Sequence, residues 1–133
     1  MTTTFVLFFV SVFALSVHAK SVSGTVTVDK GLEKSLKGGV LFVFAKKVGS
    51  KAGDGQMPVA VQRIVDPKFP VHFELNATNA MVQGTPFEGP FSISARYSAG
   101  GNATDKSGPE GSTPIDKPIK VGETAVLIEL KKK

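Results

Sequence analysis

The chain has no cysteine and no tryptophan, and it has only one tyrosine and two histidines among its 133 residues. The absence of cysteine excludes disulfide bonds, a CxxC redox pair, a thiolate zinc site and a cysteine nucleophile. Two histidines leave little material for acid–base or metal chemistry. The composition is therefore typical of a binding or structural module, and we assign no catalytic, cofactor-binding or metal-ligating residue.

The first nineteen residues predict a cleaved export signal. Phe5–Val17 is a mainly apolar run that ends in Val17-His18-Ala19, and small residues one and three positions before a cut suit signal peptidase. The run is shorter than the roughly 20 apolar residues of a spanning helix. We expect cleavage after Ala19, export across a membrane and one domain over residues 20–133. An uncleaved signal anchor is the alternative, because residues 1–4 carry no Lys or Arg.

The formal charge of +5 is spread along the chain rather than concentrated. Most lysines alternate with acidic residues, and Lys131–Lys133 is the one basic block. Charge of this kind governs solubility and non-specific association. We therefore expect a solvated basic surface and no nucleic-acid partner.

Hydrophobic periodicity is two in most of the chain, which predicts short β-strands. Six or seven such strands separated by turn residues indicate an antiparallel β-sandwich. One or two short helical turns are expected near Asp29–Leu36 and Asn76–Met81. The expected strands cover residues 22–28, 40–45, 59–64, 71–75, 91–98 and 124–130, with a short seventh at 119–121. The expected core includes Val26, Phe42, Phe44, Val61, Phe73, Ile93 and either Leu127 or Ile128.

Two segments are predicted to form long loops. Residues 46–56 form a Gly- and Lys-rich connection, and Ser98–Pro118 is rich in Gly, Ser, Pro and Thr. Long loops in compact domains are usually either functional or disordered.

Metal binding is the one chemical alternative that the residues leave open. Met57, His72 and Met81 are soft or borderline ligands that could hold copper, although Met more often fills gaps in a core. His72 lies on the polar face of an expected strand beside Glu74, so we expect it to face solvent and to have no catalytic role.

Several segments, in order, resemble one known family. They are residues 22–28, 41–45, 57–63, 69–75, 79–81, 95–103 and 111–115. The pattern resembles the C-terminal periplasmic immunoglobulin-like domain of the cytochrome c biogenesis subunit that also carries tetratricopeptide repeats, and it covers about residues 21–130. The resemblance implies an immunoglobulin-like sandwich, a periplasmic location in a Gram-negative bacterium and a link to the haem lyase assembly. It supplies no catalytic residue and no cofactor.

We therefore expect a standalone, non-enzymatic accessory of c-type cytochrome biogenesis, without the repeats and the membrane anchor of that subunit. Its partner would be a haem lyase component or apocytochrome c. Contacts are expected from Arg63, Glu74 and Arg96 and from the Ser98–Pro118 loop, since loops on a rigid scaffold often carry binding. The alternative is a soluble periplasmic carrier of copper, haem or another small ligand.

Overall fold

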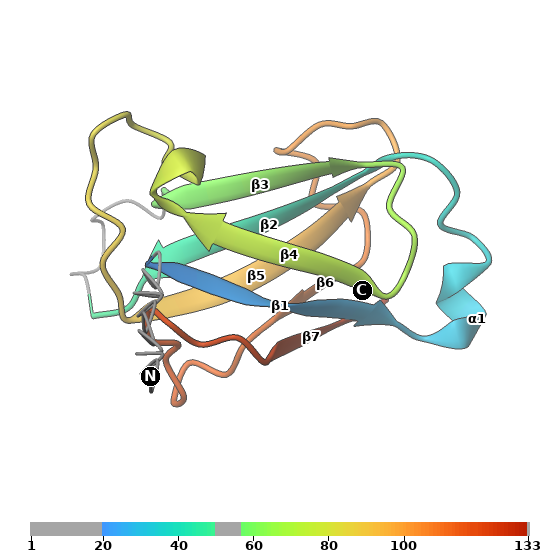
Figure 1. Ribbon diagram of the computed structural model, residues 1–133. Helices are drawn as coiled ribbons and strands as arrows, with labels where there is room; N and C mark the ends of the chain where they lie inside the picture. Colours follow the sequence, from blue (N-terminus) through green and yellow to red (C-terminus); the bar gives the residue numbers. More distant parts are fainter. Residues whose placement is uncertain (1–19, 50–56, 133) are drawn as a thin grey trace, which may run out of the picture.

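The computed structural model describes residues 20–49 and 57–132, which form two packed β-sheets with short helical turns (Figure 1). The predicted all-β, immunoglobulin-like sandwich is confirmed. The expected export signal over residues 1–19 lies outside the described residues, as does most of the predicted 46–56 loop. None of the helices within the described ranges is long and apolar enough to cross a membrane.

The described residues contain seven strands, one α-helical turn and one 3-10 turn. In chain order they are β1 (Ser21–Val28), α1 (Lys30–Glu33), β2 (Val40–Lys47), β3 (Ala60–Val65), β4 (Val71–Asn76), η1 (Ala77–Asn79), β5 (Phe91–Ser98), β6 (Glu110–Ser112) and β7 (Val126–Leu130).

One sheet has the strand order β4-β1-β7 and the other β3-β2-β5-β6. All pairs are antiparallel except β1 and β7, which run parallel. The expectation of a wholly antiparallel sandwich is therefore wrong at this pair. The first and last strands lie side by side, and the whole domain serves as their connection, so the crossover that parallel pairing needs is available.

Two predicted elements differ in detail. The short strand expected at residues 119–121 is absent from the described fold, where Ile119 makes only an isolated bridge to Phe91. The seventh strand is β6 instead, inside the predicted Ser98–Pro118 loop. Both expected helical turns are confirmed: the Asp29 carboxylate accepts from the Gly31 N–H at 3.3 Å, and the Asn76 amide oxygen accepts from the Thr78 N–H at 2.8 Å.

The core lies between the sheets and is built from alternate residues of each strand. Val26, Phe73 and Ile93 are in it as predicted, each at most 2% exposed. The open choice between Leu127 and Ile128 is settled by strand parity, because Ile128 points inward at 1% exposed and Leu127 outward at 67%. Burying each such aliphatic side chain contributes roughly 1.5–3 kcal/mol.

The two long sides of the sandwich are closed differently. On one side Glu110 and Lys131 exchange two backbone hydrogen bonds, of 3.2 and 3.0 Å, which join β6 to the end of β7. Gly111 permits this approach, since a Cβ there would collide with the Glu129 carbonyl. On the other side the Glu74 N–H of β4 donates to the Gln62 amide oxygen of β3 at 3.0 Å, so a side chain joins the two sheets.

Tyr97 fixes the turn that leads into β2. Its hydroxyl donates to the Gly38 carbonyl oxygen at 2.9 Å, with the Lys37 carbonyl at 3.3 Å. Gly39 has a φ of +69°, and a Cβ there would lie 2.6 Å from the Tyr97 oxygen, so this position requires glycine. Burial raises the pKa of the Tyr97 phenol, and the negative charge of Asp66 raises it further.

Candidate functional site

β2 is apolar on both faces, and its outer face begins the candidate site. Leu41, Val43 and Ala45 point into the core, whereas Val40, Phe42 and Phe44 form a separate cluster with Val61 on the outside of the four-stranded sheet. Phe42 and Phe44 are buried as predicted, but in this outer cluster rather than between the sheets, and Val61 is only partly buried beside them. In a strand that is apolar on both faces, polar and apolar residues do not alternate. The sequence pattern therefore could not show which of its side chains point into the core.

The register of this sheet brings charged residues beside the two phenylalanines. Phe42 pairs with Arg63 of β3 and with Arg96 of β5, and Arg96 pairs in turn with Glu110 of β6. Cross-strand partners lie on the same face of a sheet. Arg63 and Arg96, two residues expected to make contacts, therefore flank one aromatic ring from opposite sides.

Glu74, the third residue expected to make contacts, lies elsewhere. It belongs to β4 in the three-stranded sheet, where it faces solvent and its carboxylate accepts from the Asn76 side-chain amide at 3.3 Å. Glu74 therefore does not share a face with Arg63 and Arg96.

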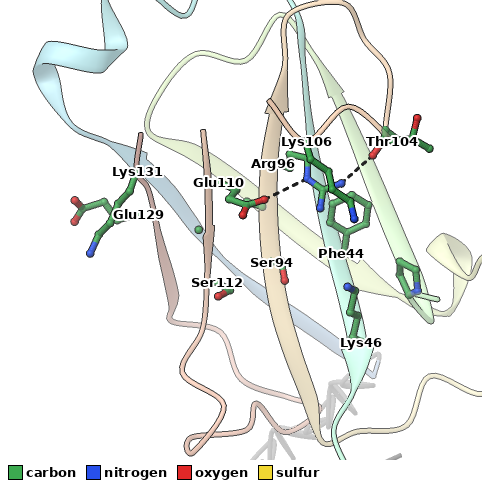
Figure 2. A pocket seen from close by; sticks show the side chains of 14 residues that line it. Phe44, Lys46, Ser94, Arg96, Thr104, Lys106, Glu110, Ser112, Glu129 and Lys131 are labelled. Carbon is green, nitrogen blue, oxygen red and sulfur yellow. Dashed lines mark hydrogen bonds and ion pairs between the residues drawn. The ribbon is translucent and has the colours of Figure 1, made fainter. Parts of the chain in front are cut away.

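Arg96 ties the sheet to the 99–109 loop. Its guanidinium lies 5.4 Å from the centroid of the Phe44 ring, a cation–π distance. Its Nη1 donates to the Ala103 carbonyl oxygen at 3.0 Å, and its Nε donates to a Glu110 carboxylate oxygen at 3.4 Å (Figure 2). The side chain is only 19% exposed. Arg96 is thus held by a ring, a loop carbonyl and a carboxylate at once.

The 99–109 loop is ordered by its own polar side chains. The Asn102 amide oxygen accepts from the Thr104 N–H, and the Asp105 carboxylate accepts from the Ser107 N–H, each at 3.0 Å. The Ser98 hydroxyl accepts from the Asn102 N–H at 3.0 Å. These hydrogen bonds give the segment between β5 and β6 a defined backbone conformation.

A groove of about 930 Å³ lies between this loop and the sheet. Phe44, Ser94 and Arg96 line its floor, and Thr104 and Lys106 of the loop stand at its upper end in Figure 2. The charged residues that line it are four cations and two carboxylates: Lys46, Arg96, Lys106, Lys131, Glu110 and Glu129. These lysines and arginine are scattered in the sequence, and the strand order brings them to one groove.

The residues considered for copper binding do not form one cluster. The His72 ring lies on the outer face of the three-stranded sheet, with Nδ1 3.2 Å from the Thr25 hydroxyl. Met57 and Met81 are exposed near the start of β3, where the Met81 N–H donates to the Val59 carbonyl at 3.0 Å. Among the described residues, no three His, Asp or Glu side chains gather as a metal site would require.

Comparison with known protein families matches residues 22–129 to the cytochrome c-type biogenesis protein H Ig-like domain. The chain belongs to this family. The match runs from β1 into β7, so it includes both sheets, Arg96 and the loop that Arg96 holds. The family expected from the sequence motifs is confirmed. No curated protein and no solved structure matches the chain.

Sequence reasoning about this family member missed β6 and, with it, the Arg96–Glu110 pair. Residues 110–112 are too few to show a period, and glycine occupies the middle position. The structure shows what joins this segment to β5: the buried Thr113 hydroxyl oxygen accepts from the Ile93 N–H at 3.0 Å.

Proposed function

We propose that this protein is a non-enzymatic, periplasmic accessory of c-type cytochrome biogenesis that works by contacting a protein partner. The family match over residues 22–129 carries the proposal, because that family is described by its role in cytochrome c-type biogenesis. The partner would be a component of that machinery, such as a haem lyase subunit or apocytochrome c.

The chemistry of the described residues supports a binding role. Acid–base catalysis needs titratable groups that converge on a reacting atom. In residues 20–49 and 57–132, the exposed His72 faces a threonine hydroxyl, and Arg96, which is paired with Glu110, lies over the Phe44 ring. Arginine and aromatic residues together are enriched at the centres of protein interfaces.

The contact surface that we propose is the outer face of the four-stranded sheet with the 99–109 loop. This surface combines Arg63, Arg96 and the groove on one rigid sheet. Because Glu74 lies on the opposite sheet, it is not part of this surface.

Deletion of the gene tests the proposal. The expected result is loss of c-type cytochromes, measured by haem staining under growth conditions that require them, with recovery when the gene is restored. Capture of the protein from periplasm should bring down biogenesis components, identified by mass spectrometry. Unchanged cytochromes together with stoichiometric copper on the purified protein would favour the carrier instead.

A further inference from the structure

The outer faces of the two sheets differ in charge. Strand positions on the outer face of the three-stranded sheet carry Glu74 and Glu129 and no lysine or arginine. The corresponding positions of the four-stranded sheet carry three cations, Lys46, Arg63 and Arg96, and one carboxylate, Glu110. The four-stranded sheet therefore presents the more cationic outer face, although Glu129 also lines the groove at its β6 edge.

The cations of this face differ in what they already bind. Arg96 and Glu110 form an ion pair at 3.4 Å, so each satisfies much of the charge of the other. Lys46 and Arg63 make no ion pair within residues 20–49 and 57–132. These two side chains are the ones that an incoming anion can bind without displacing a carboxylate.

The aromatic rings between these cations contribute little open surface. Phe42 is 5% exposed and Phe44 is 8% exposed. A partner would therefore meet mainly the charged heads, with a small apolar contact between them. Interactions of this type are strongly screened by salt and set by charge complementarity.

The spacing of the two cations fits an extended chain. Arg63 stands beside Phe42, and Lys46 lies four residues further along β2. At a rise of about 3.4 Å per residue, the two positions are about 14 Å apart along the strand. In an extended peptide, side chains four residues apart are on one face and are also about 14 Å apart, with the residue midway between them on that same face.

We propose that this face binds an extended acidic segment of a protein partner, in which two carboxylates four residues apart flank an apolar side chain. One carboxylate binds the Arg63 guanidinium, the other binds the Lys46 ammonium, and the apolar side chain lies against the small area of Phe42 and Phe44 that stays exposed beside Arg96. Arg96 acts as a positioning residue that holds the loop wall of the groove. The inference rests on the proposed protein-binding function and names the chemistry of its partner.

Three synthetic peptides test this inference on the purified chain. The first repeats Glu-Thr-Val-Thr, which places glutamates four residues apart. The second has the same composition with adjacent glutamates, and the third has lysine in place of each glutamate. The first peptide should bind most tightly, the lysine peptide should not bind, and added salt should weaken binding.

Variants then locate the site. Arg63→Glu and Lys46→Glu should each weaken binding of the spaced acidic peptide about tenfold, which corresponds to about 1.4 kcal/mol. Lys117→Glu, an exposed lysine outside this face, makes the same change in net charge and should leave the affinity unchanged. Circular dichroism of each variant verifies that it is folded.

Equal binding of the three peptides, or equal losses in all three variants, would overturn the inference. The deletion experiment tests the proposed function separately. Lost cytochromes with no preference for the acidic peptide would leave the function standing and reject this partner chemistry. Normal cytochromes with specific, Arg63-dependent binding would support this chemistry and reject the role in cytochrome biogenesis.

Discussion

The Tyr97 hydroxyl donates a hydrogen bond to the Gly38 carbonyl oxygen, 2.9 Å away, and so joins the end of β5 to the turn before β2. The two residues are far apart in sequence, and their strands are neighbours in the four-stranded sheet. Because Gly39 has no Cβ, the Tyr97 ring can lie directly against the turn. The bond therefore fixes the entry to the strand that carries Phe42 and Phe44.

Removing this hydroxyl should weaken the fold. Tyr97→Phe retains the buried ring and leaves the Gly38 carbonyl without its side-chain donor. We expect the free energy of unfolding to fall by about 1 kcal/mol, measured by denaturant titration. The native circular dichroism spectrum should be preserved. A variant as stable as the wild type would show that this bond contributes nothing.

The same phenol predicts a loss of stability at alkaline pH. Burial, and secondarily Asp66, raise the pKa of Tyr97 in the folded chain above its unfolded value of about 10. The raised pKa contributes to the free energy of unfolding. This stabilisation is fully present below the unfolded pKa and is lost as pH rises through the folded pKa. Since Tyr97 is the only tyrosine and tryptophan is absent, tyrosinate absorbance follows this group alone.

The control for this titration is Tyr97→Phe, because lysines also lose protons in that range. The wild type should lose more stability than the variant above about pH 10. Titration at the ordinary tyrosine value, with parallel stability curves for the two proteins, would contradict the prediction.

An aspartate introduced at a buried position of β5 should destabilise the fold far more than one introduced at an exposed position of β7. Ile93→Asp places an unpaired carboxylate at a fully buried position and should unfold the domain, a loss of more than about 3 kcal/mol. Leu127→Asp introduces the same group where the side chain faces solvent and should change stability by no more than about 0.5 kcal/mol. Circular dichroism and thermal unfolding distinguish the two. Equal effects would contradict the assigned parity of β7.

The sequence pattern was sufficient to predict which side chains point into the core wherever one face of a strand is polar. Ile93 and Phe73 alternate with polar residues, so their inward direction follows from period two. Phe42 and Phe44 lie in an apolar run, and their outward direction depends on pairing with Arg63 and Arg96, which no local pattern contains. For the same reason the candidate site was predicted only as separate residues, and the groove required the strand order.

Arg96 should control the order of the 99–109 loop. Arg96→Ala removes the donors to Ala103 and Glu110 together with the contact on Phe44, and should cost about 1–2 kcal/mol. Amide hydrogen exchange across residues 99–109 should become faster.

Two further variants test whether the positive charge of Arg96 alone is enough to order the 99–109 loop. Arg96→Lys keeps the charge but lacks the planar fork, so it should restore only part of the loop protection. Arg63→Ala, on the same face, should leave loop exchange unchanged. Full protection in Arg96→Lys would mean that the guanidinium geometry is unimportant.

If residues 1–19 are the export signal that the sequence predicts, the start of the mature protein is fixed. Cleavage after Ala19 should leave Lys20 as the first residue. N-terminal sequencing of the protein from the periplasmic fraction measures this. A full-length chain that stays with the membrane fraction would instead establish the signal-anchor alternative.

The hydrogen bond from the Glu74 N–H to the Gln62 side chain has a consequence for self-association. β3 and β4 are the outermost strands of their sheets on one side of the sandwich, and free strand edges are templates for pairing with another chain. Gln62 occupies an outward-facing donor of β4 and spans the gap to β3. A second molecule adding a strand to β4 would have to displace this amide first, so the glutamine protects the edge against aggregation.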